Sequence, residues 1–153
     1  MSALDKNLTS AHAEVKAEIA RTDNKTALLL AFVGALLAGI WSISSGVRLP
    51  VAAYVVGGLG VALLLAAAAL LLRAVRPNLG GRRQRPFGFP RWATLTVEEI
   101  TAALSEDTRA QDIAGLSRLA VRKFSNLRRA VDLIGVAGVL LIVAAVIAVG
   151  GAV

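Results

Sequence analysis

Residues Leu133–Val153, LIGVAGVLLIVAAVIAVGGAV, contain no charged side chain, and this stretch decides the fold class. At a rise of about 1.5 Å per residue, a helix of these 21 residues reaches about 31 Å, which matches a bilayer hydrocarbon core of about 30 Å. Two further uncharged stretches, Thr26–Val47 and Leu49–Leu72, have similar lengths. We therefore predict an all-α integral membrane protein with three transmembrane helices.

The composition supports this class and excludes others. The chain of 153 residues is 56% hydrophobic, with a mean hydropathy of +0.68. It has no cysteine and a single histidine, His12, which excludes disulfides, thiolate chemistry and a His-rich metal site. No charged side chain lies deep within a predicted span, which disfavours a transporter. The acidic residues show no catalytic arrangement, so we expect no enzyme, no cofactor and no metal.

The basic residues predict an orientation in the membrane. Arg48 is the only charge between the first two spans, whereas residues 73–131, between the second span and the third, hold twelve Lys and Arg against five Asp and Glu. Because basic loops are retained in the cytoplasm, the N-terminus and the central segment should be cytoplasmic and the C-terminus outside. Four basic and four acidic residues precede the first apolar stretch, so we expect a retained N-terminus and not a cleaved signal.

Two apolar stripes predict helices in the cytoplasmic part, because their residues recur at steps of three and four. The first comprises Leu4, Leu8, Ala11, Val15, Ile19 and Thr22, and the second Ile113, Leu116, Ala120, Phe124, Leu127, Val131 and Ile134. The first helix carries as many acids as bases, which favours packing on another helix over binding a membrane surface. The second stripe runs into the third span, so we predict one helix from about Asp107 to the C-terminus. Together these segments should form a cytoplasmic helical hairpin, in which Phe124 packs.

The sequence between the second span and this long helix predicts a loop followed by a short helix. Thr96 and Glu99 form a capping box ahead of a short helix, with Ser105 separating it from the long one. Glycines and prolines predict a loop over residues 77–93. Its basic and aromatic string Arg82–Trp92 suits lipid headgroups and interface anchoring, or alternatively a dedicated ligand loop. Nucleic-acid binding is disfavoured because no recognised binding module is present.

The resulting division of the chain runs in seven segments. They are a cytoplasmic amphipathic helix (1–25), the first span (26–47), a short outer turn (48–51), the second span (52–72), a basic cytoplasmic loop with helices (73–131), the third span (132–150) and an outer C-terminus (151–153). Small residues in the spans, such as Gly39, Gly57 and Ala144, permit close helix contact within one chain or between copies.

The order of several short motifs resembles the transmembrane effector family of Pycsar antiphage systems over nearly the whole chain. These motifs are Asp23-Asn24-Lys25-Thr26-Ala27, Arg76-Pro77, Phe87-Gly88-Phe89, Gln111-Asp112-Ile113-Ala114-Gly115-Leu116-Ser117 and Lys123-Phe124. The resemblance implies an effector encoded beside a pyrimidine cyclase that makes cyclic UMP or cyclic CMP on phage infection. Such an effector lies in the bacterial cell membrane, senses the messenger and impairs that membrane, which causes abortive infection. The family commonly has Lys-Tyr where this chain has Lys123-Phe124, so no hydroxyl is available at that position.

We hypothesise that a cytoplasmic surface senses the messenger through Asp23, Lys25, Arg118, Arg122 and Lys123, because Arg and Lys suit a cyclic phosphate. The alternative is that these residues form a solvated face and the usual basic border of a span. The partners expected are membrane lipids, the cyclic nucleotide and further copies of the chain. Two other functions remain open: a membrane-anchored helical scaffold without lytic activity, and a constitutive holin-like pore, disfavoured because it would not need the long cytoplasmic extension.

Overall fold

The structure is a computed structural model that describes residues 2–46, 49–76 and 89–151. Its helices are α1 (Ala3–Ser44), α2 (Val51–Val75), α3 (Phe89–Trp92), α4 (Val97–Ser105) and α5 (Arg109–Gly150), with no strand among the described residues. Three of them, α1, α2 and α5, are long and apolar enough to cross a membrane. The predicted all-α fold with three spans is therefore confirmed.

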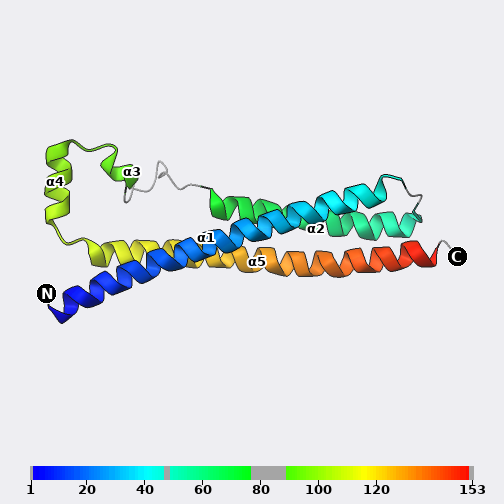
Figure 1. Cartoon of the computed structure of the whole chain (residues 1–153), viewed down its shortest axis with the longest axis horizontal. Helices are drawn as coiled ribbons and strands as arrows, with labels where there is room; N and C mark the ends of the chain where they lie inside the picture. Colours follow the sequence, from blue (N-terminus) through cyan, green and yellow to red (C-terminus); the bar gives the residue numbers. More distant parts are fainter. Residues whose placement is uncertain (1, 47–48, 77–88, 152–153) are drawn as a thin grey trace.

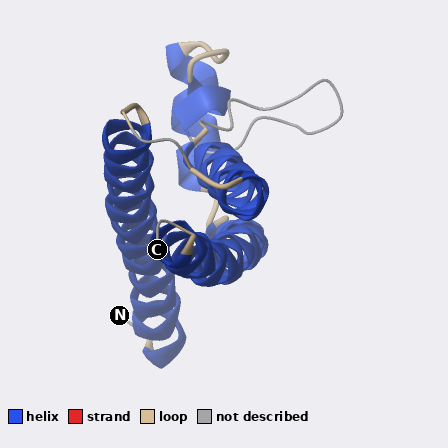
Figure 2. Ribbon diagram, turned by 90° about the vertical axis from the view of Figure 1, so that its right-hand side faces the viewer, coloured by secondary structure: helices blue, strands red, loops and turns tan. Residues whose placement is uncertain are grey.

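The three long helices form one elongated bundle. Helices α1 and α5 run in the same direction and α2 runs back between their ends, so the two termini lie at opposite ends of the bundle (Figure 1). In Figure 2, α2 and α5 are seen end-on while α1 is seen along its length, which means that α1 crosses the other two obliquely.

Helix α1 joins the predicted amphipathic segment and the first span in 42 uninterrupted residues. Its start is capped by the Ser2 side chain, which accepts a hydrogen bond from the Asp5 backbone N–H at 3.1 Å. Thr22 and Thr26 are buried where α1 packs on its neighbours. Their hydroxyls donate to the backbone oxygens of Glu18 (2.8 Å) and Thr22 (2.7 Å), so the burial leaves neither hydroxyl without a partner.

The core lies mainly between α2 and α5 and contains Leu64, Ala67, Leu71, Ala130 and Ala137, with Val33 added from α1. Small residues set the spacing of this helix pair. A Cβ on Gly60 would lie 3.0 Å from Cγ of Leu141 and 3.3 Å from the backbone oxygen of Ala137, and one on Gly57 would lie 3.5 Å from Cβ of Ala144. The predicted close contact is thus present at Gly57 and Ala144, whereas Gly39 has no atom within 4 Å of such a Cβ.

Helix α5 confirms the prediction of one helix running into the last apolar stretch, since its 42 residues are unbroken. The predicted packing stripe is wrong in part, because Phe124 is 38% exposed and Val131 is 47% exposed. The face of α5 that meets α2 follows the small residues Ala130 and Ala137, which allow close approach. Larger apolar side chains extend beyond this face, so the stripe drawn from them was rotated away from the true contact.

The connection from α2 to α5 is described only from Phe89 onward. The predicted capping box at α4 is confirmed, because the Glu99 N–H donates to Thr96 Oγ1 (3.3 Å) and the Thr96 N–H donates to Glu99 Oε2 (2.8 Å). The helix ends at Ser105, as predicted. The loop predicted over 77–93 is wrong at α3, where proline in a first helical turn costs no hydrogen bond. Arg48, residues 77–88 and residues 152–153 lie outside the described part of the chain.

Candidate functional site: a basic pocket at the end of α2

A pocket of about 440 Å³ opens where all three long helices meet. Helix α1 contributes Asp23, the end of α2 and the residue after it contribute Arg73, Ala74, Val75 and Arg76, and α5 contributes Leu119, Arg122, Lys123 and Asn126. Four basic side chains against one acidic side chain line this space. The pocket therefore has the charge of a site for an anion.

Local helix geometry explains why these residues converge. Leu119, Lys123 and Asn126 are spaced by four and three along α5, which places them on one side of the helix. Arg73 lies in the last turn of α2, where the unpaired carbonyl groups favour a positive charge. Because α2 runs antiparallel to α5, the end of α2 returns to the level of Lys123 (Figure 1).

One ion pair, between Lys123 and Asp23, crosses the pocket, and the three pocket arginines are available to bind a ligand. Lys123 Nζ lies 2.6 Å from Asp23 Oδ1, and the Lys123 side chain is only 17% exposed against 43% for Asp23. No ion pair or side-chain hydrogen bond joins Arg73, Arg76 or Arg122 to any other residue that the structure describes. Their guanidinium groups are thus free to donate to a bound anion, and Arg can do so with two parallel bonds.

The structure brings together three of the five residues predicted for the sensing surface: Asp23, Arg122 and Lys123 all line the pocket. Lys25 and Arg118 are exposed and do not line it. Lys25 follows Asp23 by two residues, about 200° around the helix, so the two side chains leave α1 on different sides. Arg118 stands one turn before Arg122 along α5, farther from the apolar part of the helix.

Sequence reasoning missed Arg73, Arg76 and Asn126. Arg73 entered the prediction only as a basic residue next to a span, and Arg76 as such a residue and as part of the Arg76-Pro77 motif. Nothing in their local sequence shows that α2 ends beside the middle of α5. Asn126 carried a usable signal, because it follows Lys123 by three residues and so shares its helix face. Among the described residues, no group of three or more His, Cys, Asp or Glu side chains is placed to hold a metal ion.

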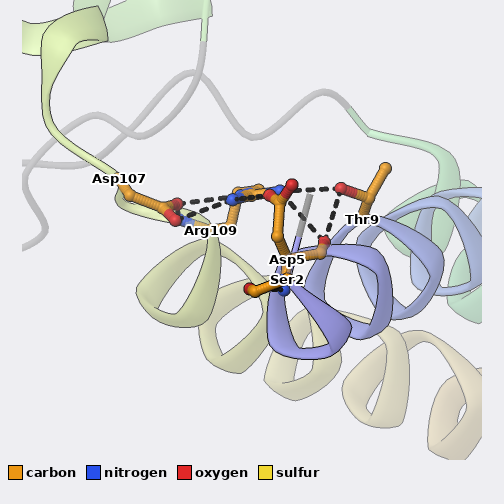
Figure 3. Close-up of polar contacts among 5 residues, drawn as sticks. All are labelled: Ser2, Asp5, Thr9, Asp107 and Arg109. Atoms are coloured by element: carbon orange, nitrogen blue, oxygen red, sulfur yellow. Dashed lines mark hydrogen bonds and ion pairs between the residues drawn. The ribbon is translucent and has the colours of Figure 1, made fainter.

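A second polar cluster fastens the starts of α1 and α5 together (Figure 3). Arg109 Nη2 contacts the carboxylates of Asp5 (2.5 Å) and Asp107 (2.8 Å). Arg109 Nη1 donates to Thr9 Oγ1 (2.7 Å) and to the Asp5 backbone oxygen (3.3 Å). The guanidinium is therefore occupied by the chain itself, in contrast to the arginines of the pocket, and we assign this cluster a structural role.

Charge complementarity in this second cluster is visible in its pKa values. Hydrogen bonds from the Arg109 side chain, and then from the Arg109 backbone N–H, lower the pKa of Asp107 from 3.8 to about 2. The hydrogen bonds to Asp107 and Asp5 in turn raise the pKa of the Arg109 guanidinium. Asp107 and Arg109 therefore both stay ionised at neutral pH.

Fold and site together define a helical membrane-type protein with three candidate spans and a basic pocket where the end of α2 meets the middle of α1 and α5. The chain belongs to the Pycsar effector protein domain family, whose model matches residues 7–150. This match covers α2 and α5 whole, α1 from Asn7 onward and every residue of the pocket, and it supports a role as a Pycsar antiphage effector. The comparisons with curated proteins and with solved structures return no match.

Proposed function

We propose that this protein is an antiphage effector that binds a cyclic pyrimidine nucleotide, cyclic UMP or cyclic CMP, and then impairs the cell membrane. The observation that carries the proposal is the pocket shared by α1, α2 and α5, with three arginines that make no ion pair within the described part of the chain. Membership of the Pycsar effector family supports the same role. The cyclic nucleotide is expected from an adjacent pyrimidine cyclase.

The pocket suits the chemistry of such a messenger. A cyclic nucleotide carries one negative charge on its phosphodiester, which Arg73, Arg76 or Arg122 can bind through charge-assisted hydrogen bonds. A volume of about 440 Å³ lies within the usual range of roughly 300–1,000 Å³ for small-molecule sites. Asn126 offers both a donor and an acceptor, which is what the edge of a pyrimidine base requires.

The position of the pocket gives the messenger a means of acting on the membrane. Lys123 is held by Asp23, so an anion that competes for Lys123 weakens the contact between α1 and α5. Binding then favours one arrangement of α1 against the α2–α5 pair over another, which is a shift of population between two states. Because α5 is continuous from the pocket to Gly150, a change at Lys123 reaches the apolar part without passing through a loop.

Leakage from liposomes tests this function. Purified protein in dye-loaded liposomes should release dye when cyclic UMP or cyclic CMP is added, and should stay tight with noncyclic UMP. Equal release with both compounds, or none with either, would refute the proposal. Liposomes with and without anionic lipid form a further arm, because a lipid headgroup offers the pocket the same phosphate chemistry. If the site binds anionic lipid and does not bind nucleotide, adding nucleotide will not increase leakage from either kind of liposome.

Substitutions on α5 test whether the nucleotide binds in the pocket. Arg122→Gln removes a guanidinium that lines the pocket and should raise the nucleotide concentration for half-maximal leakage about ten- to hundredfold, from the loss of about 1.5–3 kcal/mol for a hydrogen bond to a charged group. Arg129→Gln changes an exposed arginine of α5 outside the pocket and is the matched control. Arg118→Gln distinguishes a site confined to the pocket, where it has little effect, from a wider surface.

A scaffold without lytic activity is the second candidate, and α4 favours it. Val97 and Leu104 are exposed apolar residues on this short helix, and α4 stands apart from the three-helix bundle (Figure 1). Expression in cells separates the two functions. Loss of membrane potential only when the cyclase is active supports the effector, whereas healthy cells under every condition support the scaffold. Toxicity without any cyclase would indicate a constitutive pore.

A further inference from the structure

We infer that two copies of this chain pack side by side through a second face of α5, most of which is exposed. This face, which we call the heptad seam, consists of Ala110, Ala114, Ser117, Val121, Phe124, Arg128 and Val131. Its steps alternate strictly between four and three residues. That alternation is the spacing by which one helix packs along another in a left-handed coiled coil.

The seam is distinct from the face that packs inside the chain. Val121 is 67% exposed, and Phe124 and Val131 are also exposed, whereas Leu127 and Ala130 on the neighbouring side of the helix are buried against α2. Six of the seven seam residues are exposed and Ser117 is half-buried, and α4 makes no substantial contact with any long helix. Within the described residues, the seam is therefore an apolar helix face without a partner.

Lipid tails cannot cover the part of the seam that includes Val121 and Phe124. Arg118, Arg122 and Arg129 lie on the same stretch of α5, and so many charged groups place this stretch outside a hydrocarbon core. Val121 and Phe124 would then face water in an isolated copy. Contact with another protein helix would remove both side chains from water.

The seam continues into the apolar part of α5. Gly135 and Gly138 extend the same alternation of four and three, and a Cβ on either would meet no atom within 4 Å. Glycines on the open face of a helix in lipid let a second helix approach closely. One surface thus runs from the charged part of α5 into its apolar part, and it can pack against a single partner helix along that whole length.

A second copy of α5 fits this surface better than an unrelated helix. Each α5 is held by its own apolar segment, so two copies in one membrane share the same direction and the same depth. Identical seam positions then face one another, which is the arrangement of a parallel coiled coil. Arg128 occupies one seam position, and a single basic residue at such a place lowers stability while it restricts register and oligomer size.

Cysteine cross-linking tests the inference, which does not depend on nucleotide binding. The chain has no cysteine, so one substitution gives one thiol. Val121→Cys and Phe124→Cys in the full-length protein in liposomes, treated with copper phenanthroline, should give a disulfide-linked dimer, since bridged Cα atoms must lie within about 4.4–6.8 Å. Arg129→Cys, exposed on another side of α5 at a similar depth, is the control for random collision and should stay monomeric.

A second variant separates the seam from general misfolding. Arg128→Leu should increase the fraction of cross-linked Val121→Cys dimer, because it removes two like charges that face each other across the seam. Equal cross-linking of the seam and control cysteines, or no cross-linking of the seam cysteines, would overturn the proposal. In the second case, protection of Val121→Cys from a soluble maleimide would indicate that α4 or another part of the same chain covers the seam.

Discussion

Replacing Gly60 by isoleucine tests whether α2 and α5 are held at the separation that the structure shows. A Cβ at this position would already lie 3.0 Å from Cγ and 3.1 Å from Cδ2 of Leu141, and 3.3 Å from the backbone oxygen of Ala137. The Leu141 side chain can move, but the Ala137 carbonyl belongs to the backbone of α5. Isoleucine must therefore push the two helices apart, which costs about 1–3 kcal/mol for overpacking.

Gly58→Ile is the matched control, because a Cβ at Gly58 meets no atom within 4 Å and both positions lie in the same helix. The two variants gain the same helix propensity, so their difference isolates the packing cost. We expect Gly60→Ile to have a free energy of unfolding about 2 kcal/mol lower than that of Gly58→Ile. Steric trapping in lipid bicelles measures this quantity. Equal stability of the two variants would refute the close packing of α2 on α5.

Three further predictions concern polar contacts. The Asp23–Lys123 pair should show a coupling energy of about 1 kcal/mol in a double-mutant cycle with Asp23→Asn and Lys123→Gln, less than for a fully buried charged pair because Asp23 is 43% exposed. Additive single effects would contradict the pair. Arg109→Gln should raise the pKa of Asp107 from about 2 toward 3.8 in an NMR titration of its carboxyl group. Because the fold lowers this pKa, the stabilisation is complete above pH 3.8 and is lost as the pH falls toward 2, and an unchanged midpoint in the variant would exclude Arg109 as the cause. Thr96→Ala should destabilise α4 by about 1 kcal/mol, seen as faster amide hydrogen exchange confined to that helix, and unchanged exchange would mean that the cap contributes little.

The arginines of the basic pocket and Arg109 have different surroundings and therefore different roles. Arg109 has two carboxylates and a hydroxyl within contact, and its position ties the first turns of α1 to the start of α5. The pocket arginines have no such partners among the described residues. The proposed ligand therefore acts at the level of Asp23 and Lys123, while the ends of the two helices stay fastened. A change in crossing angle between α1 and α5 is the motion that this arrangement allows.

The amino-acid sequence by itself determined the helical class, the three apolar segments, the capping box at Thr96 and the continuity of α5. Each of these depends on local chemistry. Uncharged runs of sufficient length favour lipid, steps of three and four favour a helix, and the absence of proline after Pro90 leaves the long helix unbroken. The short motifs also sufficed to indicate the family, which the match over residues 7–150 confirms.

Only the tertiary structure decided which faces pack and which side chains meet. Nearly every residue in the apolar segments is hydrophobic, so the pattern of hydrophobicity does not define one contact face, and the small residues Gly60 and Ala137 set the rotation of α2 against α5. That rotation explains the error at Phe124. It also places Arg73 and Arg76 beside Lys123, and Asp23 is 100 residues from Lys123 along the chain. Contacts at such separations depend on how helices cross, which local sequence does not specify.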